Sequence, residues 1–511
     1  MLKKMVCMLA LLAHAAYSEL GLAPIFNDGA VLQCEMSVNI WGKADPGATV
    51  TVTFAGQSKF AVTSDSGKWL VRLDPMSASS EPRKLTVVSS VGSQTSSIDN
   101  VVVGEVWLAS GQSNMAFGLG SDKQGATWTA QTIPEIHYVL VPRKTGIPVE
   151  RDYTSEELAW KCFEPGQNAR MSAVSFYFAH KIKQETGRQI GIIQSAAAGT
   201  PIQAWTPISV LDAHPKLKHF ANSIRAGIAR GRSKEVCLAE VEADHQWYLA
   251  NREWQKTKEG SQPVRPEVKD GNPWFHRSPT VLYKNMIEPL AQYTVRGILW
   301  YQGENNIGNP PEYQVMFPGM IQAWRSAWSR PEFPFYFVQM PAWSSSAPWA
   351  EFRAAQAVAR ETLDHVGMAV TIDCGEKNDI HPKNKQPVGE RLARLALDEV
   401  YGLDVVSRGP VVQTLEKVSD RMRVVFQCSE NGLKTSDGKD GVPGFEVAGT
   451  DGAYHPAWAH IVGKDTVDLI CSDVREPVSV RYAWASWIEP PVTLQNSAGL
   501  PAEPFTCDLL K

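Results

Sequence analysis

The hydrophobic and polar positions of the chain change their pattern twice, near residues 100 and 401. Up to residue 100, short runs of β-branched and aromatic residues alternate with turn residues such as Asp, Pro, Gly and Ser. The strands predicted in this part cover residues 38–41, 49–54, 69–73 and 84–90. Regularly spaced short strands favour a small β-sandwich domain over residues 19–100.

From residue 101 to residue 401, apolar runs alternate with amphipathic segments. The predicted helices cover residues 168–187, 352–363 and 388–400, and the predicted strands cover residues 189–194, 295–300, 334–340 and 366–372. This alternation is the pattern of an α/β domain with a parallel sheet. The polar and charged segment 233–272 interrupts it, and we expect a helical insertion with a solvated face.

The β pattern returns between residues 402 and 511. Predicted strands cover residues 421–427, 466–470 and 478–483, and Asp-Gly dipeptides recur between them. Asp-Gly is a strong turn signal. A second β domain is therefore expected after the α/β domain.

One stretch of the α/β region, residues 106–115, has the pattern of a displayed nucleophile. An apolar run breaks at Gly111 and is followed by a serine between two amides, Gln112-Ser113-Asn114. A strand that ends in a glycine turn can lift one hydroxyl above the sheet. Alternatively, Ser113 or Asn114 is only the cap of a helix. The triplet Gly111-Gln112-Ser113 alone decides nothing, because residues 56–58 repeat it in a predicted hairpin.

Two further loops follow predicted strands and belong to the same edge of the sheet, where ligands bind in open α/β folds. In residues 195–205, small residues leave the amide of Gly199 accessible to an oxyanion, and Trp205 is a candidate pocket wall. In residues 300–306, a polar cluster directly follows an apolar strand, and Glu304 is a candidate for orienting a histidine. Either loop could instead be an ordinary turn.

The fourth loop, residues 379–382, contains the best-placed histidine of the chain. His381 stands beside Asp379, and a histidine next to a carboxylate can act as the general base for a serine. His180 and His219 are interpreted as structural or solvated. Together the four loops supply nucleophile, oxyanion donors and base, which are the requirements of acyl transfer. Gly-x-Ser-x-Gly and metal-binding motifs are absent from the sequence, so we expect neither a nucleophile-elbow hydrolase nor a metal or other cofactor.

The composition and the first residues limit the partners and the cellular compartment that can be expected for the protein. Residues 1–18 have the pattern of a secretory signal peptide, with Lys3 and Lys4 before a short apolar run. The run is too short to span a bilayer, and no later stretch is long enough, so no membrane partner is expected. A net charge of −4 gives no excess of positive charge that would favour binding to nucleic acid. The sequence has no Asn-x-Ser/Thr site, which favours a secreted or periplasmic bacterial protein.

Eight cysteines are present, and Cys7 belongs to the predicted signal peptide. The remaining seven are scattered, and no Cys-x-x-Cys pair occurs among them. A zinc knuckle or a thioredoxin-type site is therefore unsupported. One or two disulfides are possible for an exported chain, and their pairing is not readable from the spacing.

These residues resemble the SGNH hydrolase superfamily and, within it, the sialate O-acetylesterase family. The resemblance covers most of the chain and rests on the segments 31–33, 38–47, 104–107, 111–115, 199–205, 279–283, 300–306, 379–382, 481–484 and 499–502. It implies a three-layer α/β/α domain with a parallel sheet, flanked by the two β domains.

The resemblance also implies the roles of the site residues. Ser113 would be the nucleophile and His381 the base, and the oxyanion would be bound by the amides of Ser113 and Gly199 and by a side-chain amide. Asn305 is preferred to Asn306 for that amide because of its spacing from the glycine before it.

Two residues, Asp379 and Glu304, remain candidates for the acid that orients the histidine. The superfamily aspartate usually precedes the histidine by three residues, but that position is Asn378 here and Asp379 precedes His381 by two. Related acetylesterases use a glutamate that corresponds to Glu304. The residues expected to contact substrate are Gln112, Trp205, Gln302 and Asn306.

The sequence therefore predicts a secreted serine esterase that removes O-acetyl groups from a sugar, with O-acetylated sialic acid as the first candidate. An acetylated plant polysaccharide such as xylan is the alternative substrate. From another class, a non-catalytic carbohydrate-binding protein is the second alternative.

Overall fold

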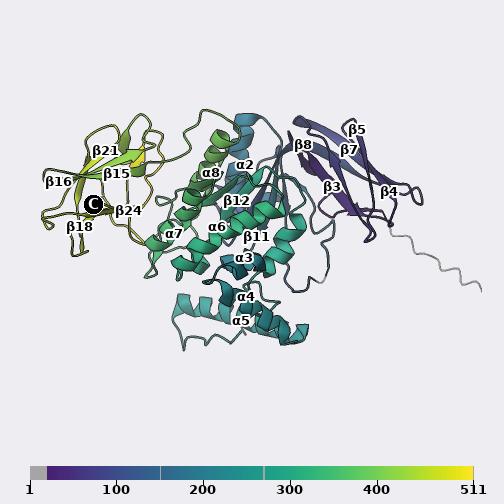
Figure 1. The fold of residues 1–511 in the computed structure, drawn as a ribbon, viewed down its shortest axis with the longest axis horizontal. Helices are drawn as coiled ribbons and strands as arrows, with labels where there is room; N and C mark the ends of the chain where they lie inside the picture. Colours follow the sequence, from purple (N-terminus) through teal and green to yellow (C-terminus); the bar gives the residue numbers. More distant parts are fainter. Residues whose placement is uncertain (1–19, 150, 269–270, 510–511) are drawn as a thin grey trace, which may run out of the picture.

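The structure is a computed structural model that describes residues 20–149, 151–268 and 271–509. The predicted signal peptide lies outside the described residues. Figure 1 shows a central α/β body between two β assemblies, one from the N-terminal part of the chain and one from the C-terminal part. The predicted fold class, an α/β domain flanked by β domains, is confirmed.

The N-terminal assembly packs two groups of strands against each other. A three-stranded sheet has the order β1-β3-β6, and β4 pairs with β5 and β7 in the second group. The strands are β1 (Gly21–Leu22), β2 (Val31–Gln33), β3 (Val38–Lys43), β4 (Thr49–Phe54), β5 (Gln57–Val62), β6 (Lys68–Leu73) and β7 (Ser79–Ser89). In β4 and β6 buried residues alternate with less buried ones, which is the period of a half-buried strand.

One long strand, β8 (Thr95–Gly111), joins this assembly to the central body. Its first part pairs with β7 in antiparallel fashion, and its second part lies parallel to β11 and β12. Every residue from Val101 to Gly111 is buried. The boundary expected near residue 100 therefore falls inside a continuous strand, and the two parts share one hydrophobic core.

The central sheet has the strand order β10-β9-β11-β8-β12-β13-β14. All neighbours on this path are parallel except the edge pair β9 and β10. The strands are β9 (Ile133–Leu140), β10 (Lys161–Phe163), β11 (Ile190–Ala196), β12 (Gly297–Tyr301), β13 (Phe335–Val338) and β14 (Val366–Ala369). Both faces are covered, which is why these strands are continuous apolar runs.

Two pairs of helices form the outer layers. On one face α2 packs on α8, and Trp107 of β8 contacts Phe178 of α2 with ring centroids 5.0 Å apart. On the other face α6 packs on α7, and Trp300 of β12 contacts Trp324 of α6 at 5.6 Å. The helices are α1 (Gly125–Thr129), α2 (Ala173–Thr186), α3 (Ile208–Ala213), α4 (Lys218–Ala229), α5 (Lys234–Thr257), α6 (Pro310–Ala327), α7 (Trp349–Thr362) and α8 (Gln386–Glu399).

The segment 233–272, expected to be a helical insertion, contains the long helix α5. Together with α4 it extends below the central body in Figure 1. Among the described residues, no helix is both long and apolar enough to cross a membrane.

The C-terminal assembly is entirely β. It contains two four-stranded sheets, β15-β16-β21-β20 and β19-β18-β22-β24, and the pair β17-β23. The strands are β15 (Val411–Val418), β16 (Arg421–Gln427), β17 (Leu433–Thr435), β18 (Phe445–Ala448), β19 (Tyr454–Pro456), β20 (Trp458–Ile461), β21 (Thr466–Ile470), β22 (Ser479–Tyr482), β23 (Leu494–Asn496) and β24 (Phe505–Asp508).

The predicted helices and strands are confirmed within a few residues, and the differences have local causes. Gly187 ends α2 in the left-handed conformation, with φ of 67°, as its place in the pattern predicts. The long helix α6 was not predicted, because Pro318 lies inside it and prolines usually end helices. The strand predicted over residues 84–90 begins earlier, because β7 starts at Ser79.

Candidate active site

The loop after β8 is shaped by Gly111. Its φ is 137°, a conformation that side chains disfavour, and a Cβ at this position would lie 2.1 Å from the carbonyl oxygen of Tyr301. The residues after Ser113 form a single turn, closed by the Ala116 N–H on the Gln112 carbonyl at 2.8 Å. No helix starts here in the described structure, so the helix-cap alternative for Ser113 does not apply.

Ser113 and His381 are in direct contact although 268 residues separate them. The Ser113 Oγ and the His381 Nε2 are 2.8 Å apart, and both side chains are partly exposed. His381 lies in the loop between β14 and α8. The neighbouring Asn114 holds this loop, because its Nδ2 donates to the Ile380 carbonyl at 3.0 Å. This is the nucleophile–base geometry that acyl transfer requires.

Asp379 is placed beside the base by the loop itself. Its Oδ1 accepts the backbone N–H of His381 at 2.9 Å and lies 3.8 Å from the ring Nδ1 of the same histidine. The Asp379 side chain is 43% exposed and that of His381 is 38% exposed. Water therefore screens the attraction between the carboxylate and the ring.

Glu304, the rival acid, is bound to the residue next to the nucleophile. Its Oε1 accepts from the Asn114 Nδ2, and its Oε2 is buried without a hydrogen-bond partner in the described residues. Burial raises the pKa of Glu304, and the hydrogen bond from Asn114 opposes this shift. On the other side of Asn114, the buried Lys385 ammonium donates to Oδ1. Burial lowers the pKa of Lys385 to about 8, and the Glu304 charge acts against that shift.

The two backbone amides and the side-chain amide that the sequence predicts as oxyanion donors are not used by other groups of the described chain. In the described structure the N–H groups of Ser113 and Gly199 donate to no protein acceptor. Gly199 has a φ of 71°, and no atom lies within 4 Å of the place its Cβ would take. The side-chain amide of Asn305 also makes no hydrogen bond within the described residues, and it is half-buried. Unused donors beside a nucleophile can bind the charge of a tetrahedral intermediate.

The remaining amides of the predicted site bind each other. Gln112 accepts the Gln302 amide at 3.1 Å through Oε1, and the Asn305 backbone N–H lies 3.4 Å from the same oxygen. Asn306 Oδ1 accepts from Gln302 at 2.8 Å and from the Ile202 N–H at 2.8 Å. Gln112 and Gln302 are buried. Their contacts tie the oxyanion loops together, and we propose this bracing role for them and for Asn306 in place of substrate contact.

Trp205 is fully buried, and its indole N–H donates to Thr200 Oγ1 at 2.9 Å. Its ring therefore supports the Gly199 loop from behind and presents no face to a ligand in this structure. The site residues that the sequence gave no role are Asn114 and Lys385. Their only signal was proximity, one beside the candidate serine and the other four residues after the candidate histidine.

Away from this edge of the sheet, one group of possible metal ligands lies close together in the described residues: Cys34, Glu35 and Glu105. Arg188 and Arg296 occupy the same place, and Arg296 Nε donates to the buried Glu105 at 2.8 Å. Two arginines on these carboxylates make the cluster an ion-pair network between β2, β8 and β12 and not a cation site. The seven cysteines of the described chain are all free thiols.

Comparison with known proteins places this geometry in a family context. The family model described as carbohydrate esterase, sialic acid-specific acetylesterase, matches residues 103–231 and 268–398. The sialate O-acetylesterase of Mus musculus is 29% identical over 530 residues, which cover 94% of this chain and 92% of that protein. The Homo sapiens sialate O-acetylesterase is 27% identical, with coverage of 94% and 91%.

Among solved structures, a carbohydrate acetylesterase from Xanthomonas citri is similar to this chain with a TM-score of 0.79. The sequence identity is 29%, and the match covers 96% of this chain and all of the other. The similarity includes both β assemblies as well as the central body. The unmatched interval of the family model, residues 232–267, contains α5.

Proposed function

Because this chain belongs to the sialic acid-specific acetylesterase family of carbohydrate esterases, we propose that it hydrolyses O-acetyl esters of a sugar with Ser113 as the nucleophile. The observation that carries the proposal is the 2.8 Å contact between Ser113 Oγ and His381 Nε2. O-acetylated sialic acid is the first substrate to test, since the curated relatives are named for it. Acetylated xylan is the alternative.

The first half of the reaction forms an acetyl-enzyme. His381 takes the proton of the Ser113 hydroxyl, and the serine oxygen attacks the acetyl carbonyl carbon. The negative charge that develops on the carbonyl oxygen is bound by the N–H groups of Ser113 and Gly199 and by the Asn305 side chain. The bond to the sugar oxygen then breaks, and His381 gives its proton to that oxygen.

The second half releases acetate. Water replaces the sugar, His381 takes a proton from it, and the resulting hydroxide attacks the acetyl-serine. Collapse of the second tetrahedral intermediate returns the proton to Ser113 and frees the acid. In this proposal Asp379 holds His381 through the backbone hydrogen bond and the charge beside Nδ1. Glu304 and Lys385 hold Asn114, which fixes the histidine loop against the nucleophile turn.

The test is acetate release by the wild-type protein and Ser113→Ala. We expect the variant to lose at least about a thousandfold in kcat on p-nitrophenyl acetate, as for other serine nucleophiles. A fluorophosphonate probe should label the wild-type protein at Ser113 and leave the variant unlabelled. Wild-type turnover in the variant contradicts the assignment. Comparison of acetate release from O-acetylated sialic acid and from acetylated xylo-oligosaccharides then identifies the sugar.

We also propose that the protein is exported and that residues 1–18 are removed. Support comes from the two lysines and the apolar run at the start of the sequence. N-terminal sequencing of the protein recovered outside the cytoplasm tests this, and an N-terminus that retains Lys3 and Lys4 contradicts it.

A further inference from the structure

A group of arginines lies at the same edge of the sheet as the catalytic pair. Arg143 comes three residues after the end of β9, just beyond Val141, whose N–H donates to the Gln194 carbonyl of β11 at 2.9 Å. The carboxyl ends of parallel strands share one edge, so Arg143 leaves the sheet where Ser113 does. This position follows from β9, a strand that the sequence pattern did not predict.

Arg277 approaches the same edge from the segment after α5. Three residues further on, the Thr280 N–H donates to the Gln203 carbonyl at 2.8 Å. The Gln203 side chain accepts from Asn306 at 2.9 Å, and Gln203 stands four residues after Gly199. The segment with Arg277 is thus tied directly to the loops that supply the oxyanion donors.

Positive charge exceeds negative charge in this group. Arg265 donates to Asp244 of α5 at 2.7 Å, and it thereby takes the carboxylate nearest to the cluster. Neither Arg143 nor Arg277 has an ion pair within 4 Å among the described residues. Burial lowers the pKa of His276 to about 3, and the charges of Arg143 and Arg277 add to that effect. At neutral pH His276 therefore adds no positive charge to the group.

A solvated surface arginine would need no partner, and this explanation suffices for Arg143, which is exposed. It does not suffice for Arg277, whose side chain is half-buried. Burial and the charge of Arg265 lower the pKa of Arg277, and the charge of Asp244, which Arg265 already binds, opposes this only in part. A partly buried cation without a carboxylate in direct contact is costly, and a planar guanidinium is suited to bind a carboxylate through two hydrogen bonds. An anion from outside the chain would supply the missing partner.

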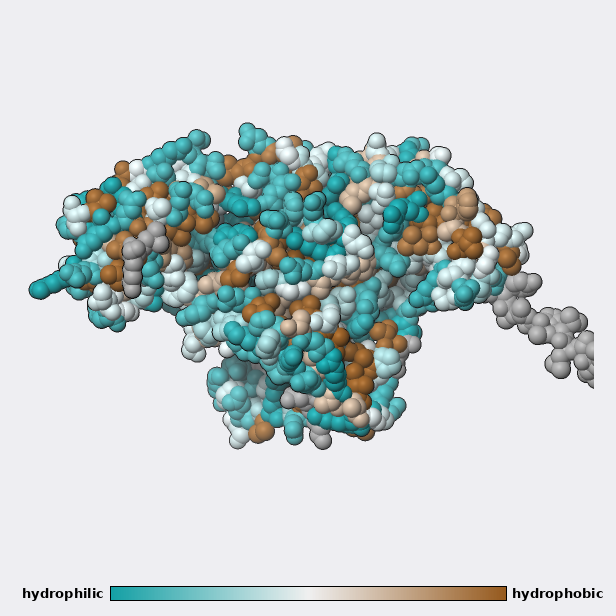
Figure 2. Space-filling view, viewed as in Figure 1, coloured by the Kyte–Doolittle hydropathy of each residue, from teal (hydrophilic) through white to brown (hydrophobic). Residues whose placement is uncertain are grey.

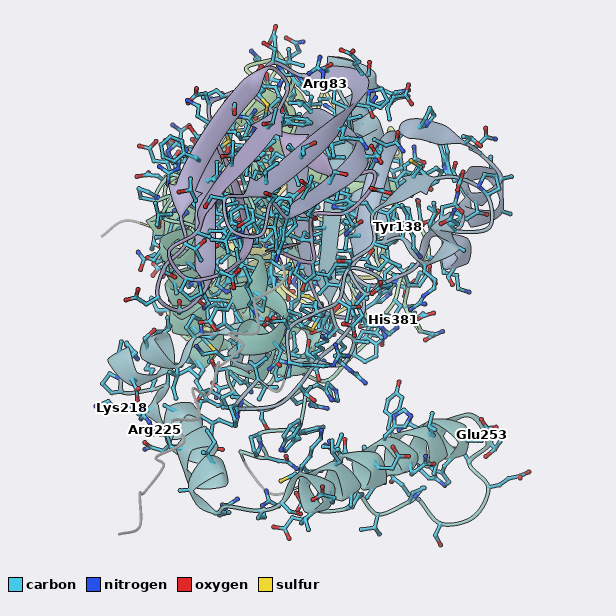
Figure 3. All side chains as sticks on the ribbon, turned by 90° about the vertical axis from the view of Figure 1, so that its right-hand side faces the viewer. Arg83, Tyr138, Lys218, Arg225, Glu253 and His381 are labelled. Carbon is cyan, nitrogen blue, oxygen red and sulfur yellow. The ribbon has the colours of Figure 1, made fainter. Side chains whose placement is uncertain are left out.

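The strand order sets the separation of the loops that carry Arg143 and the nucleophile. In the sheet order, β9 and β8 are separated by β11 alone, and neighbouring strands lie about 4.8 Å apart. The loops of Arg143 and Ser113 therefore leave the sheet about 10 Å apart, so a ligand that contacts both must extend across the end of β11. Figure 3 places His381 on the side of the central body that faces α5, the helix that holds Arg265 through Asp244.

We propose that Arg277, assisted by Arg143, binds the carboxylate of an acidic sugar whose acetyl ester lies on Ser113. The inference rests on the proposed esterase function and assigns its specificity to these two arginines. A carboxylate can come from a sialic acid or from a uronic acid of a plant polysaccharide. Both sources present the same group, and the experiment below distinguishes them.

The experiment compares charged and neutral substrates in pairs. For wild type, Arg277→Gln and Arg143→Gln, kcat/KM for acetate release is measured on an O-acetylated sialic acid and on its carboxamide. A second pair consists of acetylated xylo-oligosaccharides with and without a glucuronic acid. Arg83→Gln is the matched control, because Arg83 lies on β7 in the N-terminal assembly, far from His381 in Figure 3.

We expect Arg277→Gln to reduce the preference for the charged member of a pair about 10- to 100-fold, which corresponds to a lost charge-assisted hydrogen bond. Arg143→Gln should reduce it about threefold, because water screens the exposed side chain. A reduced preference in the sialic acid pair identifies that source, and one in the xylan pair identifies a uronic acid.

Equal losses on both members of each pair would show that Arg277 is only structural and would overturn the proposal. If Arg277→Gln does not fold, an unchanged preference in Arg143→Gln overturns it. The hydrolase assignment fails separately if the wild-type protein releases acetate neither from the four sugar substrates nor from p-nitrophenyl acetate.

Discussion

Replacing Asp379 by Asn tests which carboxylate assists the base. In the wild-type structure the His381 N–H donates to Asp379 Oδ1 at 2.9 Å. The substitution keeps an oxygen that can accept this N–H and removes only the charge beside the ring Nδ1. The loop should therefore keep its conformation. The rival substitution, Glu304→Gln, likewise keeps the acceptor for Asn114 and removes a charge.

The size of the effect follows from distance and exposure. Two unit charges 3.8 Å apart, the separation of Asp379 Oδ1 and His381 Nδ1, attract each other by about 1 kcal/mol in water and about 4 kcal/mol at a dielectric constant of about 20. Since each side chain is about two-fifths exposed, the value near water is the better guide. We expect a loss of about 1–2 kcal/mol, or about 5- to 30-fold in kcat/KM. A buried triad aspartate in serine proteases is worth about ten thousandfold.

The assay is steady-state hydrolysis of p-nitrophenyl acetate at pH 7 by wild type, Asp379→Asn and Glu304→Gln. Asp65→Asn serves as a control, because it removes the same charge from an exposed turn of the N-terminal assembly. A kcat/KM for Asp379→Asn within twofold of wild type, with a large loss in Glu304→Gln, would assign the role to Glu304. A loss of a thousandfold or more in Asp379→Asn would show that the screening argument is wrong.

Two further predictions concern buried charges. Above its pKa of about 8 the Lys385 ammonium loses its charge and its hydrogen bond to Asn114 weakens, so wild-type kcat/KM should fall between pH 7.5 and 9.5. Lys385→Met should be about tenfold less active at pH 7 and should lack this alkaline fall; a flat wild-type profile contradicts the assignment. Glu105→Gln should lower the free energy of unfolding in urea by about 3 kcal/mol at pH 7, because Arg188 and Arg296 lose a buried partner. Burial raises the pKa of Glu105, but the hydrogen bond and charge of Arg296 outweigh this effect and lower the pKa. The stability that the Glu105 carboxylate contributes is therefore lost as the pH falls through the lowered pKa, and the difference in free energy of unfolding between wild type and Glu105→Gln should become smaller. A difference that stays constant with pH refutes this prediction.

Much of the site could be predicted because parallel strands bring distant segments to one edge. Ser113, Gly199 and His381 each follow an apolar run, and their meeting point is set by strand order alone. The hydrophobic surface in Figure 2 gives no comparable guide, since apolar and polar residues are interspersed over the face shown. Which side chains of these loops face a ligand and which are buried was harder to predict. Trp205 beside a glycine loop has the same sequence pattern whether its ring lines a pocket or packs behind one.

The contacts that span the chain could not be predicted. Asn114 binds Glu304 and Lys385, which lie 190 and 271 residues further on, and no periodicity relates such positions. The Arg143 segment was missed for another reason. Strand β9 contains a proline, a glutamate and a histidine within its first five residues, so its pattern does not stand out as a buried strand.

The choice between Asn305 and Asn306 illustrates what side-chain geometry adds to spacing. Spacing alone leaves adjacent asparagines nearly equivalent as oxyanion donors. In the structure, Asn306 uses both ends of its amide, accepting from Ile202 and Gln302 and donating to Gln203. One N–H of the Asn306 amide is used by Gln203, and the three hydrogen bonds together fix the direction of the other, so turning this amide towards an oxyanion would cost about 1 kcal/mol or more. Asn305 pays no such cost, since its backbone is held by Gln112 while its side chain stays available.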